Sequence, residues 1–540
     1  MISIRHIPFR RAATLLLRSL AVASCHFLDE KPKDQLDESQ LITDARSLYL
    51  ATLGDLYAHF GSDDEGEGIM GTGRGIYDLQ TITSDEAIIP IRGADWNDGG
   101  LWIRLYTHAW ESGEAPVKNA WNYLFQMIVK SNKALQRVEN YASLLTPEEK
   151  ASYTAELQAI RAYMYYYLLD LYARVPLITG PDVALSDVAQ SERSEVFDFV
   201  VRELEAVREK LPLERSNYLG NCYGRITRPV VFLLLAKLNL NADVYMDDDW
   251  TDGVRINHPE CYKKCMDYCD SITVFPGEDY HLSPGYTENF STTNERSHEN
   301  ILTIPMDPDR YASQFQYVFR SLHYDHAAAL GMCGENGPCA TWEVLDANHF
   351  GLADEDPRFK MNYWGGAAVD ANGKQVYLNK TTPLVYKPES VELDLTGNED
   401  EKVAGARMKK YDYDPNCTTD GKMVHNDLVI FRYADVLLMR AEAMARYGED
   451  PTALVNMVRA RVEAPLLATA GLDDILRERL LELCWEGHRR QDMVRFGVFG
   501  DARRSRAQLP GEENGYTTVF PIPADAIAVN HNLEQNKGYE

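Results

Sequence analysis

The chain has 540 residues, of which 45% are hydrophobic and 25% charged, so the collagen-like, low-complexity and wholly disordered classes are excluded. Its 82 acidic side chains outnumber its 55 basic ones, which gives a net charge of −27. A surface this acidic repels phosphate, and we therefore expect binding neither to nucleic acid nor to anionic lipid headgroups. Neutral ligands such as sugars meet no such repulsion.

The first 24 residues have the pattern of a secretory signal. Arg5, Arg10 and Arg11 form a basic start, residues 12–23 are mostly apolar, and Cys25 follows small residues. This arrangement is typical of a bacterial lipoprotein, so we expect Cys25 to be the lipid-modified mature N-terminus and residues 25–45 to form a polar tether. Beyond residue 24 no run of about 20 apolar residues occurs, so we expect no transmembrane helix.

Residues 46–246 carry apolar side chains at helical spacing, which predicts an N-terminal helical part. The clearest boundary is a capping box, in which Thr146 is the N-cap, Pro147 takes the first helical position and Glu149 completes the box. We expect the tyrosines of the helix that follows to pack between neighbouring helices. The predicted helices are 44–60, 116–141, 146–172, 194–211, 227–246 and 258–272.

Eight cysteines remain beyond Cys25. Cys261, Cys265 and Cys269 are spaced four residues apart, which places them on one face of a helix. Zinc sites usually add a second pair of cysteines or histidines, and we see none, so we expect buried thiols and no metal. The sequence leaves open whether Cys333 and Cys339, which flank a glycine-containing loop, form a disulfide.

Residues 247–425 have a different sequence pattern, in which glycine, asparagine, aspartate and aromatic residues alternate with short apolar runs. This pattern predicts a loop-rich insertion of loops, hairpins and short helices, the kind of segment that often carries binding residues. Helical periodicity returns in residues 426–540. There we predict helices over 428–447, 451–461 and 473–496, followed by an irregular tail.

The last predicted helix carries Glu482, Glu486, His488 and Asp492, which by residue type resemble a catalytic cluster. Arginines surround them on both sides in the sequence, so we interpret the group as a structural ion network. No G-x-S-x-G, Walker A or H-E-x-x-H motif occurs in the chain.

Several segments together resemble one family. Residues 431–443 (FRYADVLLMRAEA), 456–461 (NMVRAR), 478–497 (ERLLELCWEGHRRQDMVRFG) and the tail from residue 521 to residue 539 resemble SusD/RagB proteins, in the family's order. The resemblance runs from Cys25 to Glu540. Ala526 and Lys537 differ from the usual acidic residue and proline of the tail.

The resemblance implies a mainly α fold. It predicts a single SusD-like domain over residues 46–540, with an α-helical scaffold of tetratricopeptide-like helix pairs and an irregular face of loops and short strands that binds ligand. It also implies a lipid-anchored protein at the outer membrane of a Gram-negative cell. Such a protein captures oligosaccharides, performs no catalysis, needs no cofactor and delivers its ligand to a SusC-like TonB-dependent transporter. Some relatives handle peptides instead.

The candidate ligand residues are aromatic and polar, because aromatic rings cover the C–H face of a sugar while carboxylate, amide and guanidinium groups bind its hydroxyls. The densest such cluster contains Arg92, Asp95, Trp96 and Asn97, and the resemblance places ligand contacts in the same loop. We expect the nearby Trp102 to pack in the core. A second set in the loop-rich part consists of Trp342, Tyr363 and Trp364.

Two alternatives stay open beside glycan binding. A peptide-binding lid of a transporter fits the same resemblance. A surface glycoside hydrolase would need paired carboxylates flanking the scissile bond, for which Asp95 and Asp98 are the only evident pair beside Trp96.

Overall fold

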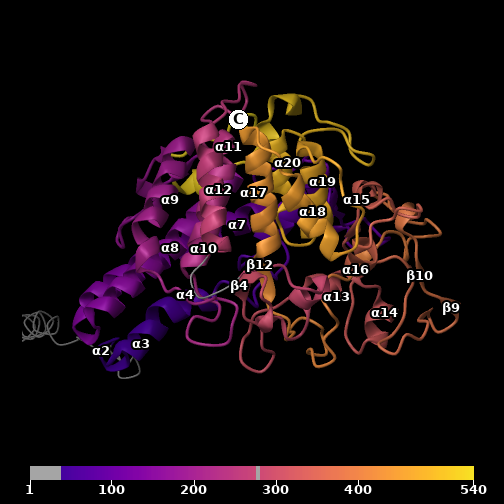
Figure 1. Cartoon of the computed structure of the whole chain (residues 1–540), viewed down its shortest axis with the longest axis horizontal. Coiled ribbons are helices and arrows are strands. Elements are labelled where there is room, and N and C mark those ends of the chain that lie inside the picture. The colour runs from indigo at the N-terminus through magenta and orange to yellow at the C-terminus, as the bar shows by residue number, and fades with distance from the viewer. Residues whose placement is uncertain (1–37, 275–279) are drawn as a thin grey trace, which may run out of the picture.

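The computed structural model describes residues 38–274 and 280–540, and within them the chain is mainly helical, as predicted (Figure 1). Cys25, the predicted signal segment and the first part of the predicted tether lie outside the described residues. The short helix α2 (Glu38–Leu41) lies where the sequence predicts an irregular tether, so that part of the prediction is wrong. Within the two described ranges no helix has the length and apolar character needed to cross a membrane.

The N-terminal helices begin and end close to their predicted positions. The capping box is present, because Thr146 Oγ1 accepts a hydrogen bond from Glu149 N at 3.1 Å and Glu149 Oε2 accepts one from Thr146 N at 2.8 Å. The helices are α3 (Ala45–Tyr49), the π-helical η1 (Leu50–Gly54), α4 (Asp55–Ala58), α5 (Ile76–Thr81), α6 (Leu101–Tyr106), α7 (Ala115–Asn140), α8 (Pro147–Tyr172), α9 (Arg193–Val207), α10 (Arg228–Leu240), α11 (Ala242–Tyr245) and α12 (Pro259–Thr273).

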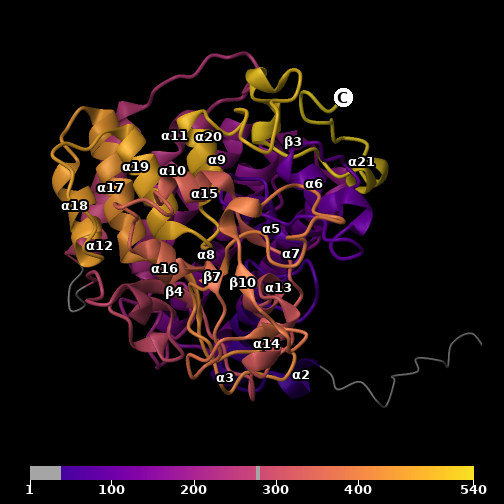
Figure 2. The ribbon, with the colours of Figure 1, turned by 90° about the vertical axis from the view of Figure 1, so that its right-hand side faces the viewer.

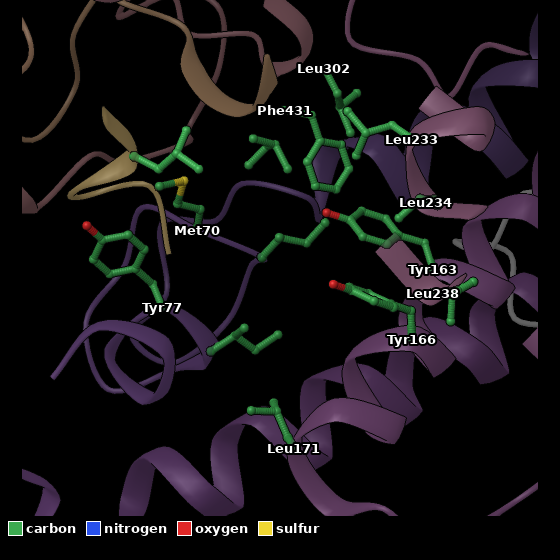
Figure 3. Close-up of a cluster of buried hydrophobic side chains, with 14 of the residues drawn as sticks. Met70, Tyr77, Tyr163, Tyr166, Leu171, Leu233, Leu234, Leu238, Leu302 and Phe431 are labelled. Carbon is green, nitrogen blue, oxygen red and sulfur yellow. The ribbon is translucent and has the colours of Figure 1, made fainter. Parts of the chain in front are cut away.

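These helices pack in pairs, α7 on α8, α8 on α9, α10 on α12, and α12 on α17 (Tyr433–Tyr447). Figure 3 shows part of the core, where Tyr163 and Tyr166 of α8 lie beside Leu234 of α10 and Phe431. The rings of Tyr163 and Phe431 lie 5.9 Å apart. The prediction that the α8 tyrosines pack between neighbouring elements is therefore confirmed.

The sequence predicts a helix from Leu428, but Leu428–Arg432 form the strand β12, and this part of the prediction is wrong. β12 pairs antiparallel with β4 (Asn300–Ile304), and both strands are buried throughout. The segment is a run of aliphatic and aromatic residues, which favours a strand when a partner strand is available. Such a short apolar run cannot be told from the first turn of a helix by periodicity alone.

The loop-rich part consists of short helices and two-stranded ladders, as predicted (Figure 2). One ladder matters for the site, because it brings the segment before Arg92 beside the segment that follows Gly337. The helices are α13 (Tyr317–Ser321), α14 (Tyr324–Ala329), α15 (Trp342–Ala347) and α16 (Arg358–Asn362). Its own antiparallel ladders are β6 (Tyr363–Trp364) with β11 (Arg407–Met408), β7 (Gly366–Ala367) with β10 (Val385–Tyr386), and β8 (Tyr377–Leu378) with β9 (Thr382–Pro383). The ladder of β1 (Ala87–Ile88) with β5 (Cys339–Ala340) joins it to the N-terminal part, within which β2 (Val175–Pro176) pairs with β3 (Gln190–Ser191).

The helix predicted over 473–496 is two helices, α19 (Leu472–Leu483) and α20 (Arg489–Phe496), so its continuity is a wrong prediction. The chain turns between them because Trp485 and Gly487 have left-handed backbone conformations, with φ of +63° and +73°. Helix α18 (Thr452–Arg461) agrees with its prediction. The tail contains one further helix, α21 (Ala524–Val529), where none is predicted.

The predicted ion network is present and lies fully buried. Arg432 contacts Glu299, Glu482 and Glu486, at 2.7, 2.6 and 2.7 Å. Arg461 of α18 reaches both Glu299 and Glu482. The network therefore ties β4, β12, α18, α19 and the turn after α19 together. Further members are Arg358, Lys410 and Glu478. Asp492 pairs with Arg479 in a second buried group, and His488, also predicted as a member, forms no ion pair with the described residues.

The three cysteines of α12 are buried thiols, as predicted. All eight cysteines in the described residues are unpaired, so Cys333 and Cys339 form no disulfide.

Replacing Glu482 with glutamine should destabilise the fold strongly. The change leaves three buried guanidinium groups without their shared counter-charge, and breaking a buried pair costs about 3–5 kcal/mol. Urea unfolding measures this loss, with Glu449→Gln as the control, because Glu449 is exposed just after α17 and such surface changes usually stay within about 0.5 kcal/mol. Equal unfolding midpoints for the two variants would contradict a central role for the network.

Stability should also depend on Asp492 at low pH. Burial by itself raises the pKa of Asp492, but the guanidinium groups of Arg479 and Arg495 outweigh it and hold the pKa at about 2. Because this value lies below the unfolded pKa of about 3.9, the carboxylate stabilises the fold above about pH 4 and loses that contribution, roughly 2 kcal/mol, as pH falls toward 2.

The measurement compares urea unfolding of the unchanged chain and of Asp492→Asn between pH 5 and pH 2. The difference in unfolding free energy between the two should narrow as the pH is lowered. A constant difference would show that Asp492 does not titrate in this range.

Candidate functional site

The loop after β1 is a tight turn held to the body of the protein by Arg92. Arg92 N donates to Asp95 O at 3.0 Å, and Asp95 N donates back to Arg92 O at 3.1 Å. The Arg92 guanidinium is buried and donates to the carbonyl oxygens of Glu401 and Ala404, at 2.7 and 2.8 Å. Arg92 therefore positions the loop and presents no free guanidinium to a ligand, which corrects the expectation for this residue.

Trp96 is fixed at the tip of this loop in an unusual backbone conformation, with a φ of +59°. Its indole Nε1 donates to Glu335 O at 2.7 Å. The guanidinium of Arg320 lies 5.3 Å from the centre of the Trp96 ring and 5.2 Å from that of Trp102. Arg320 is held in turn by Asp78, at 3.3 Å. The position of the indole thus depends on three separate segments of the chain.

A cavity of about 530 Å³ opens beside Trp96, and we call it the candidate cavity. This volume is within the range of about 300–1,000 Å³ that is usual for ligand sites. Seven of its residues come from the loop-rich part. The lining residues are Asp63, Glu65, Arg74, Asp95, Trp96, Asp98, Trp102, Gln314, Gln316, Phe319, Arg320, Tyr324, Glu335 and Lys422.

The charges of the candidate cavity are partly paired. Arg74 contacts Glu65 and Asp98, and Asp98 also accepts a hydrogen bond from Trp102 Nε1 at 2.6 Å. By contrast, Asp63, Asp95 and Glu335 form no ion pair with the described residues. Burial raises the pKa of Glu335, and Arg320 acts in the opposite direction. The cavity therefore offers aromatic surface together with acceptors and donors, and its unpaired charge is mostly negative.

A second recess of about 300 Å³ adjoins the candidate cavity and shares Asp95 and Tyr324 with it. Tyr324 Oη donates to Asp95 Oδ2 at 2.7 Å, which fixes both side chains on the boundary. Arg92, His323 and Asn336 are among its other lining residues.

The sequence-predicted residues of this loop have different outcomes. Asp95 and Trp96 both line the candidate cavity. Their role as ligand residues stays a prediction. Asn97 is exposed outside both recesses, where its Oδ1 accepts a hydrogen bond from Gly99 N and caps the short helix η2 (Asp98–Gly100). Trp102 is buried, as predicted for a core residue, although one part of it borders the cavity.

The second predicted set lies away from the candidate cavity. Tyr363 is only 3% exposed and stacks on Phe359, so its prediction as a ligand residue is wrong. Trp342 is half-buried, and the Arg504 guanidinium lies 3.3 Å above its ring. Trp364 is half-buried beneath Lys409. The rings of both tryptophans are therefore engaged by cations of the chain itself.

Sequence reasoning missed most of the polar lining. Arg74, Arg320, Tyr324 and Glu335 come from segments separated by as many as 261 positions, as the numbering shows. Of these four residues, only Tyr324 could have been chosen by residue type, because it is an aromatic residue in the loop-rich part. Many other aromatic residues occur there, so residue type alone does not single it out. Only the fold shows which of them meet Trp96.

Two family models match the chain. One is described as the SusD family and matches residues 351–539, and the other, "Starch-binding associating with outer membrane", matches residues 26–240. The starch-binding protein SusD of Bacteroides thetaiotaomicron is 24% identical over 534 residues, covering 88% of each chain. A SusD-like protein of Bacteroides ovatus is 23% identical and covers 89% of this chain and 81% of its own length.

Solved structures share the fold. A SusD superfamily protein from Bacteroides vulgatus superposes with a TM-score of 0.71 at 18% identity, covering 92% of this chain and 99% of the other. Surface glycan-binding protein A from Bacteroides thetaiotaomicron, solved in complex with laminarihexaose, gives a TM-score of 0.70 at 20% identity and covers 92% of this chain and all of the other.

Proposed function

We propose, on the premise that this chain belongs to the SusD family, that it binds glycan in the candidate cavity without cleaving it and delivers it to a transporter. The cavity itself is the observation that carries the proposal, because a fixed indole beside carboxylate, amide and guanidinium groups matches the apolar face and hydroxyl rim of a sugar. The names of the relatives, which include starch-binding and glycan-binding proteins, support the same ligand class.

A neutral glycan suits this cavity better than a uronic or sulfated one. Asp63, Asp95 and Glu335 lack ion-pair partners among the described residues, against one such cation of the lining, Lys422, whereas the Arg74 and Arg320 charges are already paired. The chain as a whole carries a net charge of −27. An anionic sugar would meet repulsion from both sources.

The non-catalytic part of the proposal is supported by the bonding of the two aspartates beside Trp96. Asp98 is paired with Arg74 and bonded to Trp102, and Asp95 accepts from Tyr324. Neither is held in an apolar pocket of the kind that prepares a general acid.

The proposal also covers where the protein acts, how it is anchored and which partner it has. We place the protein at the outer membrane, attached by lipid at Cys25, with a SusC-like TonB-dependent barrel as its partner. The family model described as associating with the outer membrane supports this location. The lipoprotein-like start of the sequence supports the anchor.

Native electrophoresis through gels that contain plant, host and microbial polysaccharides tests the binding proposal. We expect a neutral polysaccharide to retard the chain without release of reducing ends. New reducing ends would overturn the non-catalytic proposal, and retardation only by anionic polysaccharides would overturn the proposed ligand class. No retardation by any polysaccharide would favour the peptide-binding alternative.

Trp96→Ala should weaken binding to the retained glycan about tenfold or more, because stacking on an aromatic ring contributes roughly 1–2 kcal/mol. Trp364→Ala is the control, since Trp364 is also half-buried but lies outside the candidate cavity. Affinity from calorimetry with oligosaccharides measures both. An equal loss of glycan affinity in Trp96→Ala and Trp364→Ala would show that the glycan does not bind in the candidate cavity.

Gly337→Ala should also weaken binding, although Gly337 is not part of the cavity lining. A Cβ atom at this position would lie 2.5 Å from Cε2 and Cζ2 of Trp96, so the indole has to move. We expect a several-fold loss of affinity with little change in unfolding midpoint. Gly113→Ala is the matched control, because a Cβ there meets nothing within 4 Å. Unchanged affinity in Gly337→Ala would show that the orientation of the indole is unimportant.

A further inference from the structure

A third cavity, a groove of about 320 Å³, is distinct from the candidate cavity and from the second recess described above, and nothing in the proposed function uses it. In this subsection the two recesses are this groove and the candidate cavity. The groove runs between the η1–α4 segment and the chain that follows β4. Four tyrosines line it, together with aliphatic residues such as Leu50 and Pro305. The tyrosines are Tyr49, Tyr57, Tyr223 and Tyr311.

Two of these tyrosines are held rigidly by buried acids. Tyr57 Oη donates to Glu156 and accepts from Ile226 N at 2.7 Å. Tyr223 Oη donates to Asp427 at 2.6 Å. Both carboxylates belong to buried residues. The rings therefore form a fixed wall whose position is set before any ligand arrives, which lowers the entropy cost of binding.

The other two tyrosines have hydroxyl groups available to a ligand. Neither Tyr49 Oη nor Tyr311 Oη has a hydrogen-bond partner among the described residues. Tyr311 is 45% exposed, and Tyr49 is half-buried with the Arg225 guanidinium 5.1 Å from the centre of its ring. Apolar surface with isolated hydroxyl groups is the combination that a sugar chain requires, since its rings have both C–H faces and hydroxyl rims.

The groove and the candidate cavity share one bordering segment, Ser313–Gln314, which we call the ridge. Ser313 lines the groove, and the next residue, Gln314, lines the candidate cavity. Gln314 N donates to Ser62 O, and its Nε2 donates to Asp63 O, each at 3.0 Å, which fixes the ridge.

Figure 1 shows α4 and β4, which border the groove, and α13 and α14, which border the candidate cavity, along the lower part of the view.

We propose that the tyrosine-lined groove is a second subsite for the same glycan, which binds further sugar units of a neutral chain that extends from the candidate cavity across the Ser313–Gln314 ridge. This inference rests on the proposed function, because it takes the candidate cavity as the first subsite. It adds a length requirement, in which short oligosaccharides fill one subsite and longer ones fill both.

The test measures affinity against chain length. The probes are malto- and laminari-oligosaccharides of two to six sugar units, or the matching oligosaccharides of whichever polysaccharide the native gels retain. Tyr311→Ala should weaken binding of the hexasaccharide about fivefold, as expected for the loss of one exposed aromatic contact, and leave disaccharide affinity unchanged. Tyr447→Ala is the matched control, because Tyr447 at the end of α17 is also 45% exposed and lies outside both recesses.

The outcomes separate this inference from the proposed function. If Trp96→Ala weakens both short and long oligosaccharides while Tyr311→Ala changes neither, the proposed function stands and the second subsite is wrong, which leaves the groove to a protein partner. Equal weakening of short and long oligosaccharides by Tyr311→Ala would also overturn the second subsite. If no polysaccharide is retained by the unchanged chain, the proposed function and this inference both fail.

Discussion

The buried ion network around Arg432 is the interaction on which the rest of the structure depends. Arg432 ends β12, and its guanidinium joins Glu299 before β4, Glu482 in α19 and Glu486 in the turn after α19. Apart from α19 and the turn that follows it, these elements are far apart in the sequence. Removing charges from water is expensive, so the network holds together only because each guanidinium meets several carboxylates.

The same network reaches toward the candidate cavity through a short series of contacts. Lys410, the second residue after β11, binds Glu486 through its Nζ at 2.5 Å. In β11, Met408 N donates to Ser321 Oγ at 2.8 Å. Ser321 is adjacent to Arg320, whose guanidinium lies against Trp96 and Trp102. The loop-rich part is thus fastened to the helices by buried charge, and this fastening places α13 where its arginine can contact the indole.

Much of the helical scaffold could be predicted from the sequence because its signals are local. The Thr146 capping box, the i, i+4 cysteines of α12 and the acid–arginine alternation around Glu482 each depend on residues within one or two turns. The failures share a non-local cause. Leu428–Arg432 became a strand because β4 was available to pair, and the helix over 473–496 broke because Glu486 turns toward Arg432.

The same distinction explains the candidate site. Trp96 and Asp95 lie in one glycine-rich loop, so its composition and the family resemblance together pointed to them. The burial of Tyr363 against Phe359 could not be read from a neighbouring pair of aromatic residues. The partners of Trp96 come from α13 and from the segment before β5, and the β1–β5 ladder brings that segment alongside the loop. Which aromatic residues remain accessible is therefore a property of the packed chain rather than of any one segment.

Two tryptophans adopt left-handed backbone conformations, and their settings differ in a way that bears on function. Such a conformation costs roughly 1–2 kcal/mol for a bulky residue, so the surrounding contacts must enforce it. At Trp485 the indole is fully buried, and the conformation serves the turn that carries Glu486 to Arg432. At Trp96 the indole is half-buried beside an open cavity, and a carbonyl acceptor and a cation hold it. This ring also packs against the core and lies 5.7 Å from the ring of Trp102. Under the proposed function, the strained backbone would serve to hold the ring in position before a ligand arrives.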